Sequence, residues 1–223
     1  MDVVFDSSSL ISVSQSCLIN SLRGLRGDNS FVVPKSVYYE VVERPLQIKR
    51  FELNAVRIKK AVDDGWLEIK RLDAKHKKMA NDISSKVNNL IYAKGKPVKL
   101  IHSGEIEALA LLKQLESNTF VIDERTTRTI IENPKRLKEL IERRRHTKAS
   151  INVDNAGLVK KMFDGLNVVR SVELIALAFE RGLIARDIPK SKQALEAALY
   201  AVKFAGCAVS GKKIEEFLSD WER

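Results

Sequence analysis

Residues 1–11 read MDVVFDSSSLI, and their pattern decides the fold. The apolar run from Val3 to Phe5 contains two β-branched residues and is typical of a short strand buried on both faces. Asp6 follows where that strand should end, and apolar positions from Leu10 to Leu18 predict a helix. Ligands of open α/β sheets bind at the carboxyl ends of strands, which makes Asp6 a candidate site residue. Aspartate is also a favoured N-cap, so capping the helix is the alternative role of Asp6.

The composition favours a polyanionic partner. The chain has 223 residues, of which 44% are hydrophobic, enough for a substantial core. Lys and Arg number 39 against 29 Asp and Glu, giving a formal charge of +10. This excess indicates nucleic acid first and an anionic membrane surface second. A basic protein without any such partner is the alternative.

Two isolated cysteines, Cys17 and Cys207, lie within helix-like apolar patterns, so we expect buried thiols in a reducing compartment. No apolar run approaches the ~20 residues of a membrane-spanning helix. The amino terminus carries Asp2 and no basic region, unlike a signal peptide. We therefore expect a soluble cytoplasmic protein without a membrane partner.

Strand-like and helix-like patterns alternate along the chain, which predicts a parallel sheet with helices on both faces. The five predicted strands lie near residues 3–5, 31–33, 66–69, 119–122 and 167–169. Residues 34–44 predict a helix that carries Glu40, and Ser103 is the expected cap of a helix whose first turn holds Glu105. Helices are also predicted after Pro189 and, with Ser210 as cap, near the carboxyl end.

Carboxylates recur at the predicted strand ends and helix starts. Asp6 and Asp123 end strands, while Glu40 and Glu105 lie on helices that begin near strand ends. Four carboxylates at one sheet edge would repel one another, and a hard divalent cation such as Mg²⁺ or Mn²⁺ would compensate them. Two such ions can clamp an in-line phosphoryl transfer. The alternatives are a surface role for Glu40 and a helix-dipole role for Glu105.

Four segments together resemble the PIN-domain proteins, a family of metal-dependent ribonucleases with a compact α/β/α fold. The segments are VFDSSSLI (4–11), PKSVYYE (34–40), GEIEA (104–108) and VIDER (121–125). The resemblance implies a three-layer α/β/α fold with a central parallel sheet of about five strands over residues 1–184. A charged insertion near 133–164 and a helical extension over 185–223 exceed the minimal domain.

The same resemblance assigns roles to individual residues. It places metal ligands at Asp6, Glu40, Glu105 and Asp123 and the active-site hydroxyl at Ser7. Many relatives have a second aspartate just after the last one, and here Glu124 stands nearby instead. Homodimers are frequent in the family, and many members are toxins paired with a small antitoxin protein. A toxin and a housekeeping RNA-processing enzyme are both compatible with this sequence.

The leading functional prediction is an endoribonuclease that cleaves RNA phosphodiester bonds with Mg²⁺ or Mn²⁺. A non-catalytic RNA-binding scaffold is the first alternative. A phosphatase of the haloacid dehalogenase type is the second, disfavoured because Ser8 stands where that chemistry usually needs another aspartate. Basic residues form two clusters that we expect to contact RNA phosphates, Lys75–Lys78 and a larger one. The larger cluster contains Arg125, Arg128, Arg143, Arg144, Arg145 and Lys148.

Overall fold

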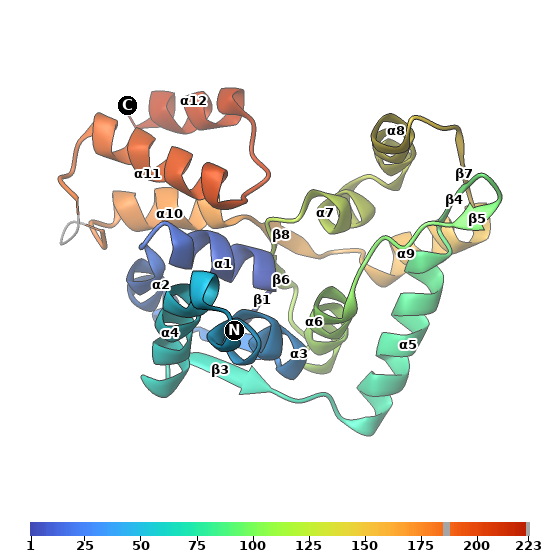
Figure 1. Ribbon diagram of the computed structural model, residues 1–223, viewed down its shortest axis with the longest axis horizontal. Coiled ribbons are helices and arrows are strands. Elements are labelled where there is room, and N and C mark those ends of the chain that lie inside the picture. The colour runs from blue at the N-terminus through green and yellow to red at the C-terminus, as the bar shows by residue number, and fades with distance from the viewer. Residues whose placement is uncertain (185–187, 222–223) are drawn as a thin grey trace.

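A five-stranded parallel sheet lies at the centre of the computed structural model, which describes residues 1–184 and 188–221. In spatial order its strands are β3 (Leu67–Lys70), β2 (Ser30–Pro34), β1 (Asp2–Phe5), β6 (Thr119–Val121) and β8 (Asn167–Val169). Every neighbouring pair is parallel (Figure 1). These are the strands expected from the sequence, so the prediction of a parallel α/β sheet is confirmed.

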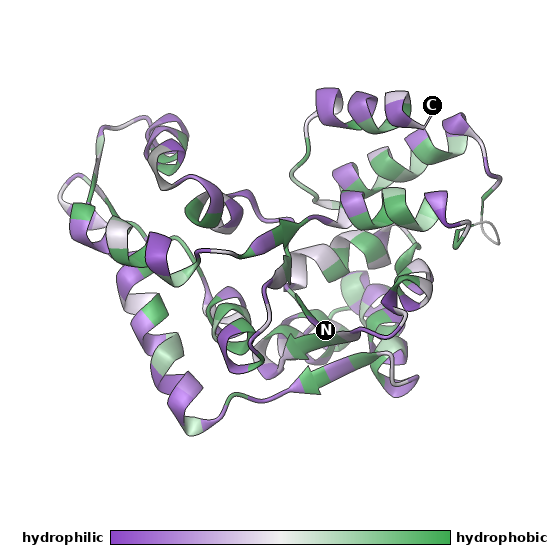
Figure 2. Ribbon diagram, turned by 180° about the vertical axis from the view of Figure 1, so that it is seen from behind, coloured by the Kyte–Doolittle hydropathy of each residue, from purple (hydrophilic) through white to green (hydrophobic). Residues whose placement is uncertain are grey.

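Side chains that alternate along the strands create two separate hydrophobic cores. Val3 and Phe5 of β1 belong to one core, whereas Val4 between them belongs to the other. Strand β6 divides in the same way, with Val121 on the first side and Phe120 on the second. Apolar strands therefore lie between helices whose outer sides are largely polar (Figure 2). The three-layer α/β/α prediction is confirmed.

Helices cover both faces of the sheet. The first core includes residues of α1 (Ser7–Gln15), α2 (Ile19–Arg26), α3 (Lys35–Tyr38), the π-helix η1 (Tyr39–Glu43), the short 3₁₀ turn η2 (Pro45–Gln47), α4 (Lys49–Asp63), α10 (Ser171–Glu180), α11 (Lys192–Ala205) and α12 (Gly211–Asp220). The second core includes residues of α5 (Ala74–Asn88), α6 (Ser103–Gln114), α7 (Arg125–Glu132), α8 (Pro134–Arg145) and α9 (Val153–Met162).

A small antiparallel sheet, absent from the sequence-based prediction, forms part of an arm beside the main sheet (Figure 1). Its strands are β5 (Lys96–Pro97), β4 (Ile91–Ala93) and β7 (Ala149–Ile151). Ile91 of β4 lies opposite Ile151 of β7. The charged segment predicted near 133–164 consists of α8, β7 and α9, so this pairing ties the segment to α5 and the β4–β5 hairpin.

Helices α11 and α12 pack into the first core, as their apolar faces predicted. Leu199 and Val202 of α11 are fully buried, as is Ile214 of α12. Ser210 caps α12 by accepting a hydrogen bond from the Lys213 backbone NH at 3.2 Å. Residues 185–187 and 222–223 of the predicted extension lie outside the described residues. The predicted homodimer stays a prediction.

Two local predictions differ from the structure. The expected helix through Leu18 ends at Gln15, because Cys17 adopts a left-handed conformation (φ 64°) before α2 begins, and its thiol is exposed rather than buried. The expected helix over 34–44 changes to π-helical geometry at Tyr39. Within the described ranges, no helix has both the length and the apolar character that crossing a bilayer requires.

Candidate active site

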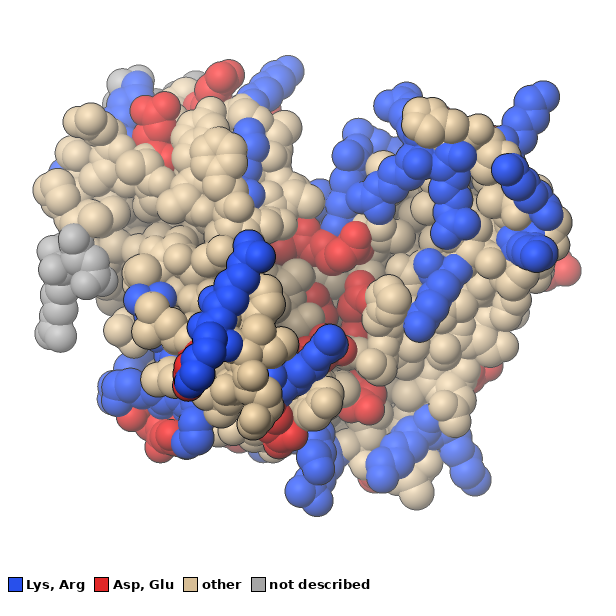
Figure 3. All heavy atoms as spheres, viewed as in Figure 1, with Lys and Arg blue, Asp and Glu red and all other residues tan. Residues whose placement is uncertain are grey.

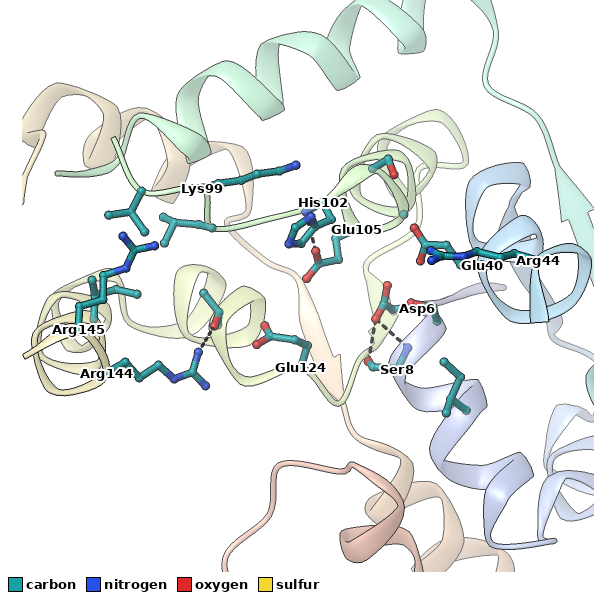
Figure 4. Close-up of a pocket in the computed structure, with 18 residues that line it drawn as sticks. Asp6, Ser8, Glu40, Arg44, Lys99, His102, Glu105, Glu124, Arg144 and Arg145 are labelled. Atoms are coloured by element: carbon teal, nitrogen blue, oxygen red, sulfur yellow. Dashed lines mark hydrogen bonds between the residues drawn. The ribbon is translucent and has the colours of Figure 1, made fainter. Parts of the chain in front are cut away.

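An open cavity of about 790 Å³ lies beside the carboxyl end of β1. Four carboxylates line it, those of Asp6, Glu40, Glu105 and Glu124. Basic side chains also line it: Arg44, Lys99, Arg144 and Arg145. Figure 3 shows acidic atoms in a central hollow and basic side chains over the neighbouring arm. Figure 4 shows the residues that line the cavity. The cavity therefore combines acidic groups with a basic rim.

Asp6 both caps α1 and lines the cavity. As the N-cap of α1, its Oδ2 accepts hydrogen bonds from the Ser8 backbone NH at 3.0 Å and from Ser8 Oγ at 2.7 Å. Its Oδ1 is buried and has no hydrogen-bond partner. Burial raises the pKa of the Asp6 carboxyl to about 6, the Ser8 hydrogen bonds oppose this, and the Glu40 charge adds to it. One oxygen is thus left available to a ligand.

Glu105 is held by hydrogen bonds to both carboxylate oxygens. Oε2 accepts from the His102 backbone NH at 2.7 Å, and Oε1 accepts from Thr127 Oγ1. His102, rather than the predicted Ser103, is therefore the N-cap of α6. Only 8% of Glu105 is exposed, and burial, followed by the charge of Asp6, raises the pKa of its carboxyl to about 7. Although largely buried, Glu105 lines the cavity together with Asp6.

Glu40 reaches the cavity from the π-helix η1 (Figure 4). Its carboxylate lies directly against Gly104 in the first turn of α6. A Cβ atom at position 104 would come within 2.7 Å of Glu40 Oε2. Glycine at this position therefore permits the close approach of Glu40 to α6, where Glu105 is the next residue. Single π-helical turns frequently occur at functional sites.

Asp123 is not brought together with the other three predicted carboxylates. It is fully buried and is not among the described residues that line the cavity. Its Oδ1 accepts from the Ser171 backbone NH at 2.8 Å, and its Oδ2 accepts from Ser171 Oγ at 2.5 Å. The carboxylate therefore fixes the start of α10 to the end of β6. Glu124, half-buried and adjacent, faces the cavity instead.

The serines after Asp6 have different positions. Ser7 lines the cavity, as its predicted role requires. Ser8 makes the hydrogen bonds to Asp6, and its Oγ also accepts from the Asp123 backbone NH at 3.0 Å. Ser8 therefore links the ends of β1 and β6. The hydroxyl that orients the Asp6 carboxylate is therefore that of Ser8.

Only two of the basic residues predicted to contact RNA line the cavity, and the Lys75–Lys78 cluster, at the start of α5, is not among the described residues that line it. The two are Arg144 and Arg145, and Arg144 also donates to Thr126 Oγ1 at 3.1 Å. Arg125, Arg128 and Arg143 line neighbouring hollows, and Lys148 is exposed just after α8. Sequence reasoning missed Arg44, Lys99 and His102, which carry no motif that marks them.

The donor chemistry of the cavity fits a hard divalent cation, although the carboxylates are spread apart. All four acids offer oxygen ligands, and Asp6 Oδ1 is a buried acceptor without a partner. Within residues 1–184 and 188–221, no group of three or more His, Cys, Asp or Glu side chains is close enough to hold a metal ion. A cation would therefore have to draw these side chains together.

A family model described as a PIN domain matches residues 2–135, which include all four predicted metal ligands and Glu124. No curated protein and no solved structure matches the chain.

Proposed function

Because the chain belongs to the PIN-domain family, which generally includes metal-dependent nucleases, we propose that it is a divalent-metal-dependent endoribonuclease. The observation that supports this most is the acidic cavity with its basic rim. Asp6 from the end of β1, Glu105 from α6 and Glu40 from η1 converge there, and one buried Asp6 oxygen has no hydrogen-bond partner. Such a cluster is unfavourable on its own and becomes favourable when a cation compensates it.

Asp6, Glu40, Glu105 and Glu124 are the residues that would hold Mg²⁺ or Mn²⁺. When bound, the cation supplies charge compensation for the phosphodiester and favours deprotonation of the attacking water. Ser8 orients Asp6, and Thr127 together with the His102 backbone NH orients Glu105. Asp123 acts as a positioning residue through Ser171 and Ser8, which fixes the strand ends from which the site is built.

The basic rim would hold the RNA backbone against the acidic floor. Lys99 and Arg145 are exposed at the cavity, and Arg144 extends into it from α8 (Figure 4). Arginine and lysine bind phosphates by charge and hydrogen bonding, and this binding does not depend on base sequence. The RNA target and a small antitoxin partner stay predictions from the sequence.

Cleavage of a fluorescently labelled single-stranded RNA tests the proposal. We expect cleavage with Mn²⁺ or Mg²⁺, none with EDTA, and a loss of at least a hundredfold in Glu105→Gln. Asp164→Asn, an exposed change on the turn after α9, is the matched control and should retain the wild-type rate. Cleavage that persists in EDTA would refute the metal-dependent reaction, and an equally active Glu105→Gln protein would exclude Glu105 from the metal site.

A non-catalytic RNA-binding scaffold is the second candidate. It is favoured by the separation of the carboxylates, since no described group of three is poised around a cation. A scaffold would bind the same RNA with the same salt dependence and leave it intact in Mn²⁺. The cleavage assay therefore separates the two functions, and RNA binding alone supports only the scaffold.

A further inference from the structure

A second, strongly basic cavity lies outside the acidic one. Its volume is about 390 Å³, and four arginines line it: Arg125, Arg128, Arg136 and Arg170. Its opposite wall is the loop from Ala208 to Ser210, between α11 and α12. The arginines come from α7, α8 and the residue before α10. Three distant segments of the sequence thus build this cavity.

The positive charge of the second cavity is only partly compensated. Glu132 is the one acid among the described residues that line it, and its carboxylate lies 3.8 Å from Arg128 Nε. Arg170 is paired with Glu173. Arg125 and Arg136 are exposed and form no ion pair with any other side chain in the described ranges. Two of the four guanidinium groups are therefore available to an anion.

Arg128 is the fixed member of the cluster. Both of its terminal nitrogens donate to the Ala208 carbonyl oxygen at 3.3 Å, which holds the guanidinium against the α11–α12 loop. Burial, and then the charge of Arg170, lowers the pKa of Arg128. Two like charges are thus held close together. A bound phosphate would relieve their repulsion and accept several charge-assisted hydrogen bonds.

A third hollow connects the second cavity with the acidic one. It measures about 370 Å³ and is lined by Arg125, Arg136, Arg143 and Arg144, with Glu139 as its acid. Arg125 and Arg136 also line the second cavity, and Arg144 also lines the acidic cavity. Arginines therefore continue without a break from the acidic floor to the α11–α12 loop. This continuity fits a chain of phosphates better than a single free anion.

We propose that this arginine track, consisting of Arg144, Arg125, Arg136 and Arg128, binds successive backbone phosphates of an RNA strand that extends from the acidic cavity toward α12. The assignment rests on the proposed ribonuclease function for the identity of the strand. It gives the α11–α12 loop a part in forming the RNA-binding surface. A polyanion bound here would be held at a distance from the carboxylates that repel it.

The test measures RNA binding separately from cleavage. Fluorescence anisotropy with a labelled single-stranded RNA in EDTA gives the dependence of log affinity on log salt for the wild type and for a double variant, Arg125→Gln with Arg136→Gln. Losing two phosphate contacts to a single strand should reduce the magnitude of that slope by about 1.4. Both arginines are exposed, so the variant should fold, and its melting temperature checks this.

The matched control removes the same charge elsewhere. Lys59→Gln with Lys60→Gln removes two exposed charges from α4, on the other side of the molecule from α8 (Figure 1). We expect this control to change the slope by less than a third as much as the track variant. Equal changes would mean that only total charge matters and would overturn the track.

Two further results separate the possible failures. If the track variant shows the reduced slope but no RNA is cleaved in Mn²⁺, the track stands and the nuclease function fails. If RNA is cleaved but the slope is unchanged, the track is wrong and the nuclease stands. Inorganic phosphate serves as the free-anion probe: if it stabilises the wild type against heat as strongly as the RNA does, the site binds a single anion instead of a strand.

Discussion

Replacing Asp6 with asparagine should stabilise the metal-free protein, because the native environment penalises the Asp6 carboxylate. Burial raises the pKa of this group from 3.8 to about 6. The ionised carboxylate therefore opposes folding by about 3 kcal/mol at pH values well above 6. Asparagine removes the charge and keeps an amide oxygen that can accept the Ser8 hydrogen bonds. Its NH₂ group replaces the unpartnered Oδ1.

The sign of the effect follows from proton binding. The native protein binds the Asp6 proton more tightly than the unfolded chain, so the wild type loses stability as pH rises from about 4 to about 6. The advantage of Asp6→Asn should be absent below about pH 4 and complete above about pH 6. For a chain of this length, 3 kcal/mol corresponds to roughly 6–12 °C in melting temperature.

Thermal unfolding in EDTA across this pH range is the assay, with Asp164→Asn as the surface control that should stay within ~0.5 kcal/mol. Adding Mn²⁺ should then raise the melting temperature of the wild type through binding linkage and leave Asp6→Asn nearly unchanged. A variant that gains no stability at high pH would refute the argument from burial. Equal Mn²⁺ shifts in the two proteins would remove Asp6 from the metal site.

Three further predictions concern neighbouring residues. Burial and the Asp6 charge raise the pKa of Glu105 from 4.5 to about 7. In EDTA, Glu105→Gln should therefore gain stability relative to the wild type as pH rises from about 4.5 to about 7, as measured by urea unfolding. Gly104→Ala should keep or slightly raise stability, because alanine favours the helix. The new Cβ should displace Glu40 and so reduce the Mn²⁺-induced rise in melting temperature, whereas an unchanged rise would exclude Glu40 as a ligand. Ser171→Ala should cost about 1–3 kcal/mol in urea unfolding, because it leaves a buried Asp123 oxygen unpaired, and a neutral result would contradict that bond.

The strands of the main sheet were predictable because each central strand is a short apolar run buried on both faces. It failed at the second sheet, whose strands are only two or three residues long and pair across a wide separation, as Ile91 does with Ile151. Runs so short contain too little alternation to distinguish a strand from a loop. The antiparallel sheet of the arm was therefore not predictable from local pattern.

In the candidate site, too, some positions were predictable from the neighbouring sequence, whereas others depend on contacts with distant residues. Asp6 follows its strand directly, so its position at the sheet edge was predictable. Asp123 and Glu124 are adjacent, and only one of them faces the cavity. Ser171 decides which one, because it binds both Asp123 oxygens from the start of α10. That contact spans 48 residues and leaves no local signal in the sequence.

The packing of α11 on α1 has a consequence for the order in which the protein can fold during synthesis. Helix α1, which Asp6 caps, is synthesised well before α11, which packs against it. Gly206, just after α11, lies against α1, with Ser12 Oγ 3.4 Å from where its Cβ would be. Until α11 has been made, the side of α1 that packs against it therefore stays exposed on a nascent chain, although α2, α4 and α10 can already pack against other parts of the helix. The helix that Asp6 caps thus receives its complete packing only after the segment that follows α10 has been synthesised.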